Sequence, residues 1–351
     1  MSRASWGLLS VATLRCGLDS WQGCGPRTET PPPYTEPTLD TPHDPLAGLR
    51  PAADSRDPRA SALLRSFSPG MPLQDRPVLL GLPYDGGIPS RPGARFGPKA
   101  LREALGAYGT FDGQRELGEV VDMGDLTLAS MNGARTHARI EEASRNLFAA
   151  GARPIFIGGD HGLTGSLIRG LAAARPSLRL ALVTIDAHLD VREYDNESSL
   201  SSGTPFRRAL ETPILSGART AMLGIRYLAN SRYYVSWARE QGIHLYTVED
   251  IAERGAVAVT REALSRIMKD ADALYLSVDI DAADAAVAPG VSAVGVGGLS
   301  SREMIDVVRT VSAEPRLLGA DLMELSPPHD ENARTARLTA RLFLEILSAR
   351  E

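Results

Sequence analysis

Cysteine is nearly missing from this chain of 351 residues. Its two cysteines, Cys16 and Cys24, both lie among the first thirty residues. Their position excludes a disulfide framework, a cysteine nucleophile and a thiolate metal cluster from the rest of the chain. Lysine is almost as scarce, because only Lys99 and Lys269 occur and arginine supplies the other basic residues. Few residues are therefore candidates for Schiff-base chemistry.

Long hydrophobic runs and an excess of positive charge are also absent. No apolar stretch of the sequence approaches the roughly 18 residues that a membrane-spanning helix needs. The net charge of −5 and the pI near 5.8 argue against non-specific nucleic-acid binding. Hydrophobic residues make up 43% of the chain and charged residues 23%, as in ordinary globular proteins. We therefore expect a cytoplasmic protein with no membrane or nucleic-acid partner.

Residues 1–74 differ in composition from the rest. An apolar run over residues 6–14 superficially resembles a signal peptide, but Arg15 interrupts it and no small-residue cleavage site follows. An organellar transit peptide is an alternative, and Met71 is a second candidate start. Many Pro, Thr and Asp residues follow, which predicts an arm that is partly disordered or extended. We expect one domain over residues 75–351 and no chemistry before it.

The domain alternates between apolar strand patterns and helical patterns. Strands are expected at 78–82, near Val120, and at 154–157, 180–186, 221–225, 243–247, 273–279 and 317–321. Helices are expected from Pro98 onward and at 134–150, 163–174, 230–241, 260–270, 301–313 and 332–348. The connections are long enough for crossover helices, so the pattern predicts an α/β fold whose mainly parallel sheet is covered on both faces.

Metal-ligand side chains follow three of these strands. The apolar run 180–185 leads into Asp186, His188 and Asp190. Side chains alternate along a strand, so these three can gather on one side at its carboxyl end, where open α/β sheets bind ligands. A solvated turn with an incidental histidine is the alternative explanation of this stretch by itself.

The other two strands add three more candidate ligands. Asp279 and Asp281 end the strand at 273–279, and His161 follows the strand at 154–157 after a double-glycine turn. The four carboxylates of the set carry a formal charge of about −4, which two divalent cations would cancel. Without metal they would repel one another and raise their own pKa values. The set therefore predicts a two-metal site.

Glu324 repeats the design of a strand followed by an acid. It comes after the apolar strand at 317–321 and just before the double-proline turn of Pro327 and Pro328. It is either a rim carboxylate paired with an arginine or a group that binds a cationic part of the substrate. We favour substrate binding, because the other strand ends carry the candidate ligands.

These residues resemble the arginase–agmatinase–formimidoylglutamase family of ureohydrolases. The resemblance covers roughly residues 77–348. It rests on four motifs and on the loop around Arg91–Pro98; the motifs are Gly158-Gly159-Asp160-His161, Asp186-Ala187-His188-Leu189-Asp190, Ser277-Val278-Asp279-Ile280-Asp281 and Glu324-Leu325-Ser326-Pro327. The family implies an arginase-like three-layer α/β/α fold, a homo-oligomer of three or six chains, and two manganese ions (Mn2+) per chain.

Carried over position by position, the family's ligand pattern assigns the six side chains. His161 and Asp190 would hold one manganese ion, and His188 and Asp281 the other. Asp186 and Asp279 would bridge the two ions. Glu324 would hold the cationic nitrogen of an amidine or guanidine substrate, whose C–N bond is hydrolysed.

Within the family, two positions favour formimidoylglutamase. Ser202 stands where arginases and agmatinases usually carry a proton-shuttling histidine, and Arg192 follows the metal motif. The loop 289–293 is also similar to that of formimidoylglutamases, whereas Gly162 and Ala285 depart from the usual family residues. Formimidoylglutamate carries two carboxylates, so Arg192 and Ser202 are the predicted substrate-binding residues, with further arginines at 207, 208 and 226.

Two alternatives stay open at this point. One is an agmatinase or another guanidino-acid hydrolase that releases urea. The other is a metal-binding but catalytically silent member of the family, because the hydroxyl of Ser202 is a poor general acid at neutral pH.

Overall fold

A nine-stranded sheet forms the centre of the computed structural model, which describes residues 54–129, 131–194 and 200–349. The strands lie in the order β1-β3-β2-β4-β9-β8-β5-β6-β7, and all neighbours are parallel. They are β1 Leu64–Ser66, β2 Pro77–Leu82, β3 Val120–Asp125, β4 Arg153–Gly158, β5 Leu180–Ile185, β6 Thr220–Ile225, β7 His244–Thr247, β8 Ala273–Asp279 and β9 Leu317–Met323. The predicted α/β class with a mainly parallel sheet is confirmed.

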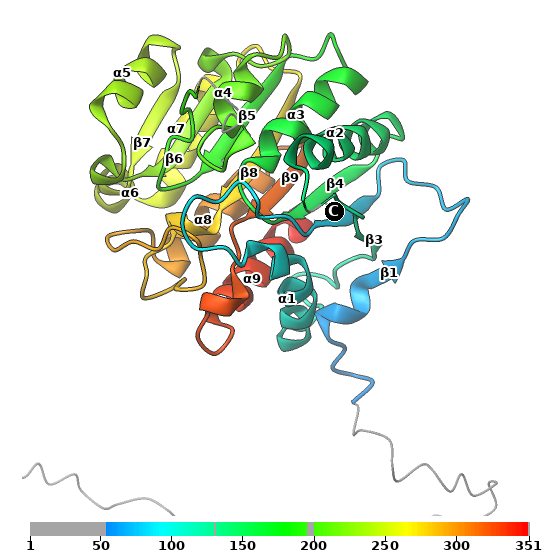
Figure 1. Ribbon diagram of the computed structural model, residues 1–351. Coiled ribbons are helices and arrows are strands. Elements are labelled where there is room, and N and C mark those ends of the chain that lie inside the picture. The colour runs from blue at the N-terminus through cyan, green and yellow to red at the C-terminus, as the bar shows by residue number, and fades with distance from the viewer. Residues whose placement is uncertain (1–53, 130, 195–199, 350–351) are drawn as a thin grey trace, which may run out of the picture. The chain divides into compact units, whose positions relative to one another are not determined.

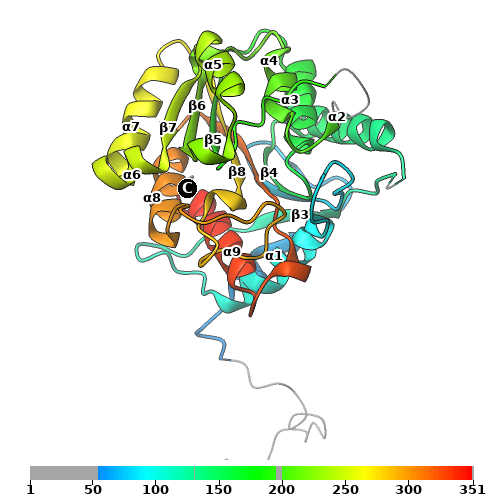
Figure 2. The same ribbon diagram turned by 60° about the vertical axis from the view of Figure 1, so that its left-hand side comes forward.

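Helices cover both faces of this sheet and make three layers (Figures 1 and 2). Buried side chains of α2–α5 pack on one face, and those of α1 and α6–α9 pack on the other. The helices are α1 Gly97–Ala104, α2 Gly133–Ala149, α3 Leu163–Ala174, α4 Pro205–Leu210, α5 Arg232–Glu240, α6 Val248–Arg254, α7 Ala256–Ile267, α8 Ser301–Ser312 and α9 Arg334–Ser348.

Side-chain alternation along the central strands divides the core in two. On β5, Leu180 and Leu182 face α2–α5, whereas Ala181, Val183 and Ile185 face the opposite layer. The α2–α5 face turns polar toward the carboxyl ends of the strands, at Thr184 and then Asp186. The opposite face stays apolar up to the ends of the strands. The candidate site therefore lies on the α2–α5 side of the sheet.

Several short elements were not expected from the sequence. The edge strand β1 lies within the region predicted to be an arm, and it pairs with β3. The helices α4 and α6 span only 6 and 7 residues, too few to show a clear helical period. The predictions for residues 1–53 lie outside the described residues. In the part of the chain that is described, no helix has the length and apolar character required to cross a membrane.

Gly170 allows α2 and α3 to pack closely, and this contact generates a stability prediction. A Cβ atom at Gly170 would lie 2.3 Å from the carbonyl oxygen of Glu141 and 2.6 Å from the Cβ of Ser144. In an open helix, Gly→Ala is stabilising. We expect Gly170→Ala to lower the free energy of unfolding by about 1–3 kcal/mol instead, because overpacking outweighs helix propensity.

Urea unfolding would measure this change. Gly106→Ala is the matched control, since a Cβ at Gly106 has nothing within 4 Å, and it should leave stability unchanged or slightly higher. Equal stability of the Gly170→Ala and Gly106→Ala proteins would contradict the packing argument.

Candidate metal centre

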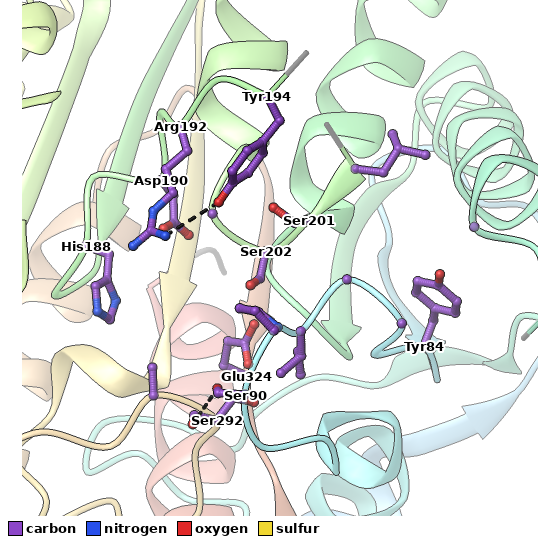
Figure 3. A pocket seen from close by; sticks show the side chains of 18 of the residues that line it. Tyr84, Ser90, His188, Asp190, Arg192, Tyr194, Ser201, Ser202, Ser292 and Glu324 are labelled. Carbon is purple, nitrogen blue, oxygen red and sulfur yellow. Dashed lines mark hydrogen bonds between the residues drawn. The ribbon is translucent and has the colours of Figure 1, made fainter. Parts of the chain in front are cut away.

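Four neighbouring strands bring the predicted site residues together. His161 follows β4, Asp186 to Asp190 follow β5, and Glu324 follows β9. Asp279 ends β8, and Asp281 comes two residues later. Because β4, β9, β8 and β5 are consecutive in the parallel sheet, their carboxyl ends meet at one edge. A cavity of about 970 Å³ opens there (Figure 3).

His161 is the centre of the first group of ligand atoms. Its Nδ1 lies 3.1 Å from Asp186 Oδ2, 3.3 Å from Asp190 Oδ2 and 3.1 Å from Asp279 Oδ2. The ligand atoms of these four residues all lie within 4.8 Å of one another. One imidazole nitrogen and three carboxylates thus converge on a single point.

A second group forms around His188 and shares Asp186 with the first. His188 Nδ1 lies 3.0 Å from Asp281 Oδ2 and 3.5 Å from Asp186 Oδ1. Asp186 therefore presents Oδ2 to the first group and Oδ1 to the second. Asp279 belongs to the first group, and its other oxygen accepts the backbone N–H of Asp281 at 2.8 Å.

Hydrogen bonds behind His161 determine which ring nitrogen carries the proton. Ser277 Oγ donates to Asp321 Oδ1 at 2.6 Å and lies 2.9 Å from His161 Nε2. Since the hydroxyl proton of Ser277 is used, Ser277 must accept a proton from Nε2. Tyr275 and Thr164 donate to the other oxygen of Asp321 and fix it. With its proton on Nε2, a neutral imidazole would direct the lone pair of Nδ1 at the three carboxylates. Without a cation, burial lowers the pKa of His161, but the hydrogen bonds to these carboxylates outweigh it and raise the pKa well above its ordinary value.

This arrangement is electrostatically incomplete without a cation. Burial, followed by the charges of Asp281 and Asp186, raises the pKa of Asp279 well above its ordinary value. Burial and the charge of Asp186 likewise raise the pKa of Asp190 to about 6. Within the described residues, the buried atoms His161 Nδ1 and Asp186 Oδ2 have no partner outside this group of ligand atoms. A divalent cation would satisfy both atoms, and imidazole with carboxylate ligands suits such an ion. The residues present fit a metal centre.

Two residues at the site have an unusual backbone conformation. Asp190 has a φ angle of 48° and Glu324 one of 68°, a region that non-glycine residues seldom adopt. Each costs roughly 1–3 kcal/mol and persists only where the surroundings impose it. Here this backbone conformation turns the carboxylates of Asp190 and Glu324 toward the cavity, which both residues line.

Glu324 lies beside the first group of ligand atoms. Its Oε1 accepts the backbone N–H of His161 at 2.8 Å, whereas Oε2 is buried and has no partner among the described residues. Burial, followed by the charge of Asp160, raises the pKa of Glu324 to about 8. No arginine within the described residues pairs with Glu324, which removes the rim-carboxylate explanation.

Of the arginines considered as substrate ligands, only Arg192 lines the cavity. Arg207 stacks on Trp237 at 4.0 Å. Arg208 is buried and donates to the carbonyl oxygen of Gly162, and Arg226 donates to that of Asp281. These three arginines hold loops in place. Ser202 also lines the cavity, and its backbone N–H donates to Gly87 at 3.0 Å.

Sequence reasoning missed the roles of Ser277 and Asp321. They are partners in the register between β8 and β9, which brings the two side chains together. Strand order cannot be read from a single sequence, so their pairing had no local signal. The one available hint was that Ser277 lies two residues before Asp279, on the same face of β8.

The model of the arginase family matches residues 75–348. The chain belongs to the arginase family. It is 32% identical over 278 residues to a formimidoylglutamase of Halalkalibacterium halodurans, covering 78% of this chain and 86% of that protein. It is 36% identical over 275 residues to a guanidinopropionase of Pseudomonas aeruginosa, covering 77% and 85% of the two chains.

Solved structures agree with this membership of the arginase family. The formimidoylglutamase of Bacillus subtilis superposes with a TM-score of 0.81 at 28% identity, over 86% of this chain and 94% of that one. The formiminoglutamase of Trypanosoma cruzi, solved with Mn2+, has a TM-score of 0.75 at 27% identity, over 84% and 100%. This arginase-family chain is thus a metal-dependent hydrolase that acts on C–N bonds of amidines.

The shared position of Asp186 predicts how metal is lost on substitution. We expect Asp186→Asn to weaken manganese binding at both groups, because it removes a charge that the two groups share. Asp190→Asn should retain about one ion per chain, because Asp190 belongs to the first group only. Metal analysis after gel filtration would measure the content.

The control for this experiment is Asp272→Asn, which alters an exposed ion pair with Arg179 and should leave the metal content unchanged. Manganese at the wild-type level in the Asp186→Asn protein would contradict the shared role of Asp186.

Proposed function

We propose that this protein is a formimidoylglutamase that splits N-formimidoyl-L-glutamate into L-glutamate and formamide, as in histidine degradation. Water adds to the formimidoyl carbon, and the bond from that carbon to the glutamate nitrogen breaks. Arg192 is the single arginine among the described residues that line the cavity, and this observation carries the choice of an acidic substrate. We also predict a homo-oligomer of three or six chains and a cytoplasmic location.

The proposed metal ligands are the six side chains of the two groups. His161 and Asp190 would hold one manganese ion, and His188 and Asp281 the other. Asp186 and Asp279 would bridge, and the two oxygens of Asp186 already face different groups. When bound, the two ions supply Lewis-acid chemistry and lower the pKa of a water molecule.

Glu324 is the proposed ligand for the cationic end of the substrate. Its Oε1 is occupied by the backbone of His161, which leaves Oε2 to accept an N–H from the formimidoyl group. The backbone bond holds the carboxylate beside the first group of ligand atoms. Glu324 would therefore place the trigonal carbon next to the metal centre and compensate its positive charge.

Arg192 is the proposed ligand for a substrate carboxylate. Its backbone N–H donates to Gly203 at 2.9 Å, and a Cβ atom at Gly203 would lie 3.0 Å from Arg192 Cδ. Gly203 thus gives the arginine stem room to lie against the loop. The guanidinium contacts the hydroxyl of Tyr194 at 3.5 Å, and no acid pairs with it among the described residues. The guanidinium of Arg192 is therefore available for a bidentate bond to a carboxylate.

Ser202 would bind the substrate and not transfer a proton. Its hydroxyl lies at the cavity wall between Arg192 and Glu324 (Figure 3). A hydroxyl has too high a pKa to act as a general acid at neutral pH. In this proposal Ser202 orients the substrate by hydrogen bonding, which distinguishes the chain from family members with a histidine there.

A guanidino-acid hydrolase is the second candidate function. The 36% identity to guanidinopropionase favours it, and guanidino acids also carry the carboxylate that Arg192 would bind. Agmatine fits less well, because its distal amine would face Arg192.

A substrate panel separates these candidates. With manganese bound, we expect formamide from N-formimidoyl-L-glutamate at a kcat/KM at least tenfold above that for urea release from guanidino acids or agmatine. Formamide and urea would be measured separately. Efficient urea release from a guanidino acid would overturn the choice of substrate. A protein that binds manganese but turns over no amidine would support the catalytically silent alternative.

The role of Arg192 predicts a change in KM. We expect Arg192→Met to raise KM for an acidic substrate by about tenfold or more with kcat little changed, since a charge-assisted hydrogen bond is lost. The control is Arg232→Met, at an exposed position on α5. Equal KM values in the Arg192→Met and Arg232→Met proteins would place the carboxylate elsewhere.

A further inference from the structure

The cavity continues beyond the metal centre to a second end. There it is lined by Tyr84 and by the first residues of α2, including Asn132, Gly133 and Ala134. Figure 3 shows Tyr84 at the opposite side of the cavity from His188, with Ser202 and Glu324 between them. None of the residues at this end has a role in the proposed chemistry.

The hydroxyl of Tyr84 lacks a partner although the residue is buried. Tyr84 is 7% exposed, and its side chain makes no hydrogen bond within the described part of the chain, whereas its backbone bonds Leu82 and Asp160. The hydroxyl lies close to Gly133, because a Cβ atom on Gly133 would be 3.0 Å from the hydroxyl oxygen. Tyr84 thus aims an unused hydroxyl at the first residue of α2.

The amino end of α2 has unused donors at the same place. Asn132 caps the helix by accepting the backbone N–H of Arg135 at 2.9 Å, and its carbonyl oxygen accepts that of Thr136 at 3.0 Å. The N–H groups of Gly133 and Ala134 have no partner among the described residues. α2 spans 17 residues, so its amino end carries the positive end of a full helix dipole.

The two acids nearest to Tyr84 are each held by at least one backbone N–H group. Asp85 pairs with Arg95 and accepts the backbone N–H of Gly93 at 2.7 Å. Asp160 accepts the backbone N–H of Gly87 through Oδ2 at 2.9 Å, whereas its buried Oδ1 has no partner among the described residues. A hydroxyl and two amide N–H groups, all able to donate, therefore converge on this end of the cavity, a pattern that suits an anion.

We propose that Tyr84 Oη and the N–H groups of Gly133 and Ala134 form an anion subsite for a carboxylate. The carboxylate belongs either to the distal end of the substrate or to a separate small acid. The first source rests on the proposed function, whereas the subsite itself does not.

Titration calorimetry of the manganese-loaded protein with glutarate tests the subsite without turnover. We expect saturable binding that Tyr84→Phe weakens about tenfold, since a hydrogen bond to a charged group is lost. Gly133→Ala should also weaken it, because the added methyl crowds the hydroxyl of Tyr84. Alanine is the better helix former, so the melting temperature should not fall. Tyr233→Phe, at a 64% exposed position, is the control and should bind glutarate like wild type.

Kinetics separate the two sources of the carboxylate. If the carboxylate is the substrate's own, glutarate competes with substrate and Tyr84→Phe raises KM with kcat unchanged. If a separate acid binds, glutarate binds alongside substrate. Either result supports the subsite. Equal glutarate affinity in wild type, Tyr84→Phe and Gly133→Ala would place the anion at the metal ions or on the surface, and would overturn the proposal, as would a lack of saturable binding to wild type.

Discussion

A buried imidazole nitrogen that faces three carboxylates is the constraint on which the rest of the site depends. Nδ1 of His161 faces Asp186, Asp190 and Asp279 because Ser277 holds the opposite nitrogen. Asp321 in turn holds Ser277. Such an arrangement is unfavourable in a dry interior unless positive charge lies between the groups. The side chains around His161 therefore fit a divalent cation, whose positive charge would offset the carboxylates.

The substrate loop depends on the same part of the fold. Gly162 follows His161 directly, and a Cβ atom there would lie 2.7 Å from the carbonyl oxygen of Ser201 and 2.9 Å from that of Leu200. The loop with Arg192 and Ser202 can pack against the metal-bearing turn only because Gly162 has no side chain. Gly162, which departs from the usual family residue, is thus part of the geometry that shapes the cavity.

Much of the fold could be predicted from the sequence, because its signals are local. Apolar runs and helical periods predicted the central strands and the long helices, and acids at strand ends predicted the cluster around Asp186. Strand order and register are not local, so the contact of Ser277 with Asp321 could not be foreseen. The same holds for Arg207, Arg208 and Arg226, whose loop-holding bonds appear only in three dimensions. The open end of the cavity at Tyr84 likewise depends on α2, far away in sequence.

Anomalous diffraction at the manganese absorption edge, from crystals grown with Mn2+, tests the central claim most directly. The account predicts two anomalous peaks, one on each side of Asp186, with His161 Nδ1 and His188 Nδ1 each bound to a different peak. Density that shows protonated His161 bonded directly to the carboxylates, with no anomalous peak beside it at saturating manganese, would contradict the account.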